Sequence, residues 1–111
     1  MWLLTPRGFF SAVQDRNDPD RVLVRARVGA DLEALRDLLP EIEVVFGEGT
    51  DYPWRAWIPR DDWARAVHAM CGEIDYGNFK NAIADRQGYA RAGIYSEVWG
   101  TLHGLERLND A

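Results

Sequence analysis

The segment 49–63 constrains the fold of this chain more than any other stretch. It reads GTDYPWRAWIPRDDW, and it places turn-forming residues before an alternating stretch that carries two of the five tryptophans. Pro59 and the charged residues behind it are typical of the start of a helix. The segment therefore predicts a turn, a strand over 52–58 and a helix that begins near Arg60.

Length and composition favour one soluble domain. The chain has 111 residues, of which 47% are apolar, and its single cysteine, Cys71, cannot form an internal disulfide. Together with the lack of a signal-peptide pattern, this suggests a cytoplasmic protein. No apolar run is long enough to cross a membrane. The net charge of −5 disfavours general binding to nucleic-acid phosphates.

Alternating apolar residues predict a four-stranded antiparallel sheet. The strands cover 2–14, with a turn or bulge over 5–8, and then 22–28, 42–46 and 52–58. The first two strands are expected to form a hairpin. Side chains alternate between the two faces of a strand. One face is expected to carry Val22, Val24, Ala26, Val28, Tyr52, Trp54, Ala56 and Ile58, and the other Leu23, Arg25, Arg27, Arg55 and Trp57.

Four helices are predicted from capping residues and apolar spacing. The first runs from an N-cap at Asp31 to residue 39, and the second covers 60–74 with Cys71 on its buried stripe. Asn78 caps a third helix through 85, which ends at Gly88. The last helix covers 89–108, and residues 109–111 form a frayed tail.

A shift of 30 residues superposes 24–28 on 54–58 and Asp31 on Asp61. This match predicts an α+β fold built as a possible ββα-ββα repeat, with units 1–40 and 41–75 and two C-terminal helices over 76–108. A chance match remains an alternative, because strand-to-helix junctions resemble one another. The sheet face that carries the arginines is then either a binding surface or a seat for the C-terminal helices.

Common catalytic and cofactor motifs are missing from the sequence. His68 and Cys71 lie three residues apart, but no further ligands at zinc spacing accompany them. Ser11 and Ser96 lack a nucleophile elbow, and no glycine-rich phosphate loop is present. We therefore expect no metal and no cofactor, and an enzyme is the less favoured hypothesis.

A set of polar and aromatic residues from several segments forms the predicted ligand site. Converging arginine, lysine, tyrosine and asparagine side chains suit a carboxylate or a phosphate. The alternative is a structural ion pair between Asp51 and an arginine, with Asn78 acting only as a helix cap. The site residues are Arg25, Arg27, Asp51, Tyr52, Arg55, Tyr76, Asn78 and Lys80.

Trp57 beside Arg25 and Arg55 indicates a second candidate surface. An aromatic ring next to arginines on a sheet face resembles a platform for stacking nucleic-acid bases. The acidic net charge argues against such a role, as does the expectation that Tyr95 and Trp99 of the last helix cover that face. Nucleic acid is therefore a disfavoured partner.

Several motifs resemble a family of small bacterial proteins of about this length. They are Thr5-Pro6-x-Gly8-Phe9-Phe10-Ser11, Val24-Arg25-Ala26-Arg27, Gly49-Thr50-Asp51-Tyr52 and Tyr76-x-Asn78-Phe79-Lys80. The resemblance spans nearly the whole chain and implies one complete domain. It implies no activity, cofactor or partner.

The leading hypothesis is a small cytoplasmic binding or regulatory module that engages an anionic ligand or a protein partner. One alternative is an acidic inhibitor of a nucleic-acid-binding protein, of the kind that blocks defence systems, because the chain has 18 acidic residues. Another is a small enzyme with Asp51 or Tyr52 as its general acid or base. A homodimer, joined through sheet edges or through the Trp57 face, is also possible.

Overall fold

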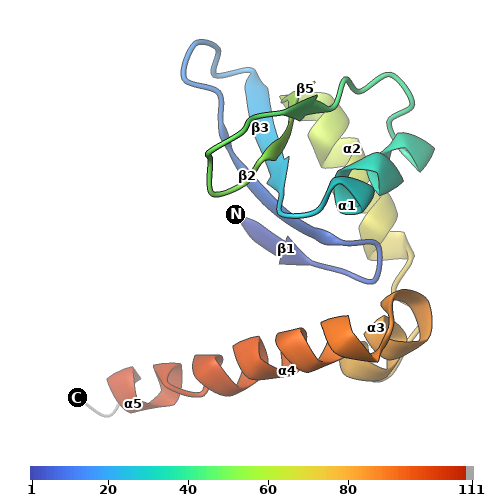
Figure 1. Ribbon diagram of the computed structural model, residues 1–111, viewed down its shortest axis with the longest axis vertical. Coiled ribbons are helices and arrows are strands. Elements are labelled where there is room, and N and C mark those ends of the chain that lie inside the picture. Colours follow the sequence, from blue (N-terminus) through green and yellow to red (C-terminus); the bar gives the residue numbers. More distant parts are fainter. Residues whose placement is uncertain (110–111) are drawn as a thin grey trace. The chain divides into compact units, whose positions relative to one another are not determined.

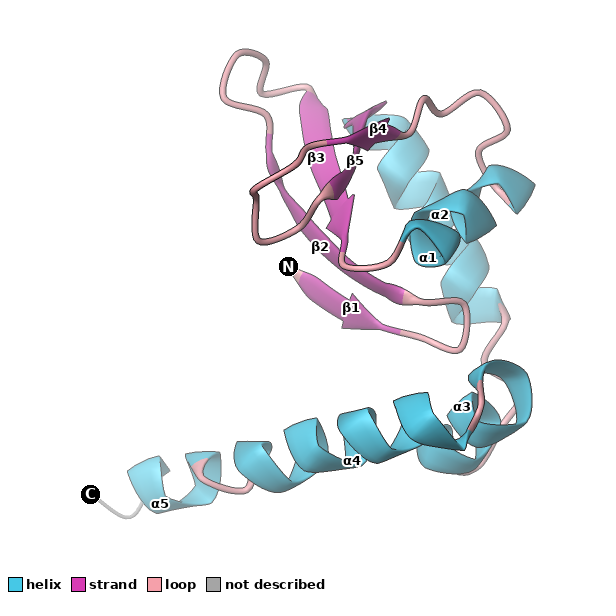
Figure 2. Cartoon of the chain, viewed as in Figure 1, coloured by secondary structure: helices cyan, strands magenta, loops and turns pink. Residues whose placement is uncertain are grey.

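The computed structural model describes residues 1–109 and has an α+β fold (Figure 1). Five antiparallel strands form one sheet in the order β1-β2-β3-β5-β4 (Figure 2). The α+β class and the antiparallel sheet are confirmed, but the prediction of four strands is wrong by one. The strands are β1 (Trp2–Leu4), β2 (Phe9–Gln14), β3 (Arg21–Ala26), β4 (Val45–Phe46) and β5 (Trp54–Pro59).

The additional strand arises at the turn between β1 and β2. The Thr5 N–H donates to the Gly8 carbonyl at 2.9 Å, and the Gly8 N–H donates back at 3.2 Å. The chain therefore reverses here, and Trp2 pairs with Ser11 across an antiparallel ladder. Only glycine fits at position 8, because a Cβ there would lie 2.8 Å from Asp31.

The predicted helix over 31–39 is shorter and more irregular than expected. It consists of α1 (Gly29–Glu33) followed by the 3-10 turn η1 (Ala34–Asp37). Asp31 lies inside α1, whose N-cap is Val28, so its assignment as the N-cap is wrong. Its buried carboxylate instead accepts a hydrogen bond from the Phe9 N–H at 3.0 Å. A tertiary contact with β2 therefore takes the place of a local cap.

The strand predicted over 42–46 is reduced to the two residues of β4. Ile42 and Val44 are partly buried and pack against the hydrophobic core. Their alternation reflects this packing and not pairing in the sheet. The hairpin of β2 with β3 is confirmed by its register, in which Ala12 lies opposite Val24.

The helix α2 (Arg60–Gly72) begins where the sequence predicted. Its buried residues are Trp63, Ala66 and Met70. Cys71 is exposed beside this stripe, so the expectation of a buried cysteine is wrong. The helix completes the larger of two compact units, Met1–Asp75, which we call the sheet unit.

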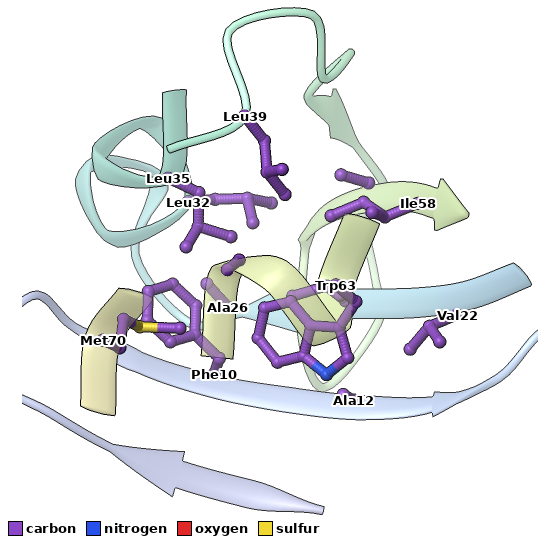
Figure 3. Packing of buried hydrophobic residues seen from close by; sticks show 13 residues of the cluster. Phe10, Ala12, Val22, Ala26, Leu32, Leu35, Leu39, Ile58, Trp63 and Met70 are labelled. Atoms are coloured by element: carbon purple, nitrogen blue, oxygen red, sulfur yellow. The ribbon is translucent and has the colours of Figure 1, made fainter. Parts of the chain in front are cut away.

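The hydrophobic core of the sheet unit lies between one face of the sheet and the helices α1 and α2 (Figure 3). The rings of Phe10 and Trp63 meet edge to face, with their centroids 6.2 Å apart. Alternate residues of β3 and β5 point into this core, as predicted. Fully buried members include Phe10, Val24, Ala26, Leu32, Leu35, Ala56 and Ile58.

The second compact unit, Tyr76–Ala111, is called the helical unit here. It contains α3 (Phe79–Gln87), α4 (Tyr89–Leu102) and α5 (Leu105–Asn109), so the last predicted helix is interrupted by a turn at 103–104. Asn78 caps α3 as predicted and accepts the Asn81 N–H at 2.9 Å. Gly88 ends α3 with a φ of 97°. Of the predicted frayed tail, residues 110 and 111 lie outside the described residues.

Candidate anion-binding face of the sheet

Within the sheet unit, the sheet face opposite the core carries the predicted arginines. Ser11, Arg25 and Arg55 form one row across β2, β3 and β5, because Ser11 pairs with Arg25 and Arg25 pairs with Arg55. Both helices of this unit pack on the other side of the sheet. Because no helix of the sheet unit covers this side, we call it the open face. Its members are Ser11, Val13, Leu23, Arg25, Arg27, Arg55 and Trp57.

The central pair of this row has few partners. Arg25 donates from Nη2 to the hydroxyl of buried Ser11 at 2.9 Å. Its Nε is also buried, and no acceptor for it is found within residues 1–109. Arg55 donates from Nε to the Tyr52 carbonyl at 3.1 Å. Both guanidinium groups therefore keep donors that the protein does not use.

Tyr52 anchors the arginines from the loop that precedes β5. Its buried ring has the Cζ of Arg25 at 4.7 Å from the centroid and that of Arg27 at 4.4 Å. Arg27 also donates to the Asp51 carbonyl at 2.8 Å. The ring of Phe9 lies 6.3 Å away. These contacts bring Arg25, Arg27 and Tyr52 together as cation-π partners.

Tyr52 lies on the side of the sheet opposite to the predicted one. It was expected to share a face with Trp54, which packs against the core. Its partners Phe9 and Arg25 belong to the other face. The rule of alternation does not extend to Tyr52, because β5 begins at Trp54 and a turn precedes it.

The charges of the arginine cluster are not balanced by carboxylates. Over the described part of the chain, Arg25, Arg27 and Arg55 form no ion pair. Asp51 meets Arg27 through its backbone carbonyl and not through its carboxylate. The ion pair that was the structural alternative is therefore not observed. A cationic cluster stands on the surface of a chain with a net charge of −5.

Three of the predicted site residues belong to the helical unit and make local contacts there. Asn78 is the N-cap of α3. Lys80 places its Nζ 5.0 Å from the ring centroid of Trp99. Tyr76 lies next to the Phe79 ring, at 6.1 Å between centroids. The structure thus gathers Arg25, Arg27, Asp51, Tyr52 and Arg55 in the sheet unit, and Tyr76, Asn78 and Lys80 in the helical unit.

Sequence reasoning missed Ser11 and Phe9 as members of the site. Both lie on β2 and reach the arginine cluster through the pairing of β2 with β3. The signal that finds them is the register, since Ser11 lies directly opposite Arg25. A prediction based on single strands carries no such register.

No metal site accompanies this face. Within residues 1–109, no group of three or more histidine, cysteine, aspartate or glutamate side chains is arranged to hold a metal ion. Nor does any helix of that part of the chain have the length and apolar character needed to cross a membrane. The arrangement can supply hydrogen bonds and positive charge to an anion.

No family model, curated protein or solved structure matches the chain. The open face, with its opposed and unpaired arginines, is the feature of the molecule that most strongly indicates a binding role.

Proposed function

We propose that this protein is a small binding module that holds an anionic ligand on the open face through Arg25, Arg27 and Arg55. The observation that carries the proposal is the register of β3 and β5, which places Arg25 directly opposite Arg55. No carboxylate within the described residues pairs with either side chain.

Opposed like charges on a sheet need a physical explanation. Side chains directly opposite each other on antiparallel strands have their Cβ atoms about 5 Å apart, and like charges there destabilise the sheet. A bound anion converts this repulsion into attraction. Guanidinium groups suit that task, because their N–H donors match the oxygens of carboxylates and phosphates in pairs.

A purely structural role would require the arginines to use their donors within the protein. Arg27 and Arg55 do hold the loop before β5, through the carbonyls of Asp51 and Tyr52. Each guanidinium has five N–H donors, however, and these bonds use one donor apiece. The remaining donors support a ligand-binding role.

The internal repeat offers a reason for the opposed pair. Arg25 and Arg55 occupy equivalent positions when the sequence is shifted by 30 residues. Each belongs to a strand that is followed by a helix, β3 by α1 and β5 by α2. We infer that two ββα units face each other about an approximate two-fold axis between β3 and β5. Such an axis places the equivalent residues Arg25 and Arg55 opposite each other, on either side of the axis.

Calorimetric titration with inorganic phosphate tests the proposal. The wild-type chain is expected to bind phosphate, and Arg25→Gln and Arg55→Gln are each expected to weaken binding about ten-fold or more, since each removes charge-assisted hydrogen bonds. Arg16→Gln is the matched control, because it removes the same charge from an exposed loop residue outside the face. It should leave the affinity nearly unchanged.

The stability of the ligand-free variants separates binding from structure. Arg25→Gln loses the cation-π contact with Tyr52 and the charge of the donor to Ser11, but it also relieves the repulsion with Arg55, so the free energy of unfolding should fall by no more than about 1 kcal/mol. The proposal would be refuted if the wild-type protein does not bind phosphate and Arg25→Gln causes a large loss of stability. That result would make the arginines structural.

A further inference from the structure

A row of apolar side chains runs beside the cationic row on the open face. Val13 pairs with Leu23, and Leu23 pairs with Trp57, across β2, β3 and β5. Each member lies two residues along its strand from a member of the row Ser11, Arg25 and Arg55. Two residues of a strand span about 7 Å. The open face therefore presents an apolar row and a cationic row at a fixed spacing.

Trp57 is the prominent member of the apolar row. The residue is 39% exposed, and its position on β5 places it between β3 and β4. Trp63, by contrast, is buried in the core. Trp54 lies on the core face of the sheet, opposite to the open face, and packs against the core. Trp57 thus leaves a large flat ring in contact with solvent, where aromatic rings offer a stacking surface.

We infer that the anion of the proposed site is the phosphate of a nucleotide, whose base stacks on Trp57 while Arg25 and Arg55 hold the phosphate. This inference rests on the proposed function and names its ligand. A nucleotide combines an anion with a flat aromatic ring, and a single sugar can span the spacing of about 7 Å between the two rows. Base stacking on an aromatic side chain tolerates all bases, so this contact selects a nucleotide as a class.

The charge of the chain bears on the source of the nucleotide. Long nucleic acids are held by many cations along their phosphates. This chain has a net charge of −5, and the cations gathered at the site are Arg25, Arg27 and Arg55. That balance favours a ligand with one or a few phosphates. A free nucleotide and the end of a single strand share this chemistry.

Titration of the full chain with four probes tests the inference. The probes are AMP, inorganic phosphate, adenosine and a short oligoadenylate. AMP is expected to bind at least about ten-fold more tightly than phosphate or adenosine, because it makes both contacts. Trp57→Leu should reduce the affinity for AMP to that for phosphate and leave phosphate binding unchanged. Trp99→Leu, which removes another exposed tryptophan, is the matched control and should retain tight AMP binding.

The outcomes separate this inference from the proposed function. If phosphate binds and AMP binds no more tightly, the nucleotide is excluded while the anion site stands. If neither binds, both proposals fail. Tight AMP binding that Trp57→Leu leaves intact also overturns the inference. Where AMP binding depends on Trp57, an oligoadenylate that binds no more tightly than AMP assigns the ligand as a free nucleotide, whereas a tighter one assigns it as a single strand.

Discussion

The sheet unit and the helical unit differ in how they bury their apolar residues. The sheet unit encloses side chains such as Phe10, Leu32 and Leu35, which are 0% exposed. In the described part of the helical unit, the buried residues are Ala82, Ile83 and Tyr95. Large apolar side chains are left exposed along α4 and α5, namely Tyr89, Ile94, Trp99, Leu102, Leu105 and Leu108.

The interactions of the two units differ in range as well. In the sheet unit, Arg7 lies in the turn before β2 and pairs with Glu73 beyond the end of α2, 66 residues away. In the helical unit, the contacts of Asn78 with Asn81 and of His103 with Glu106 each span three residues, and that of Lys80 with Trp99 spans 19. The comparison teaches that the sheet unit is held by an enclosed core and by ties between its two ends, while the helical unit is held by contacts of shorter range in the chain.

The largest expected difference comes from deleting one buried side chain in each unit. Leu35→Ala should destabilise the sheet unit by about 3 kcal/mol, because it opens a cavity in a close-packed core. Ile83→Ala is the matched substitution at a residue that is also 0% exposed. It should raise hydrogen exchange in α3 and α4 and leave the exchange of β2, β3 and β5 unchanged. Urea titration and segment-resolved hydrogen exchange measure both effects.

Equal losses of protection in both units after Ile83→Ala would break this comparison. The chain would then unfold as a single cooperative body.

A smaller effect is expected from Arg7→Met, which tests the long-range ties of the sheet unit. Arg7 donates to Glu73, to Asp37 and to the Ala34 carbonyl at 2.8 Å. We expect a loss of about 1–2 kcal/mol in the free energy of unfolding. The Ala34 carbonyl loses its donor, whereas water can solvate the exposed carboxylates of Asp37 and Glu73. Arg7→Lys should recover only part of it, since lysine lacks the planar fork.

The pH dependence of the Arg7 contribution has a definite sign. The hydrogen bond from Arg7 to Glu73 is the main factor that raises the pKa of Arg7 above its ordinary value. A group whose pKa is raised in the folded state stabilises that state fully at pH values below its unfolded pKa. The Arg7→Met effect on the free energy of unfolding should therefore not fall as the pH rises from 7 to 9. A decline over that interval would show that another group governs the effect.

The smallest expected effect concerns the cap of α3. Asn78→Ala removes the acceptor of the Asn81 N–H and should cost about 1 kcal/mol locally. Hydrogen exchange should rise in the first turn of α3 and stay constant in β2, β3 and β5. Asn78→Asp keeps an acceptor oxygen and should retain the protection. Fraying that spreads into β2, β3 or β5 would contradict the local nature of this effect.

The sequence predicted the elements whose signals are local. The alternation in β3 and β5 identified their buried residues, and Asn78 and Gly88 marked both ends of α3. These predictions succeed because side-chain periodicity and capping depend on residues close in the chain. The same alternation placed Arg25 and Arg55 on one face of the sheet, where the structure finds them.

Local signals failed where distant contacts decide the conformation. The residues 5–8 are compatible with a bulge or with a reversal, and the pairing of β1 with β2 selects the reversal. Asp31 resembles an N-cap, but its carboxylate accepts a hydrogen bond from the Phe9 N–H. Cys71 fits an apolar stripe, yet it lies at its solvent-exposed edge.

The sequence by itself determined the fold class, the two faces of β3 and β5 and the types of residue available to a site. The tertiary structure alone decided that Arg25 stands opposite Arg55, that Ser11 completes their row and that Tyr52 supports them from the loop before β5. The physical reason is that strand register depends on turns and on packing between segments far apart in the chain. A shift of one residue in that register would have put the two arginines on opposite faces of the sheet.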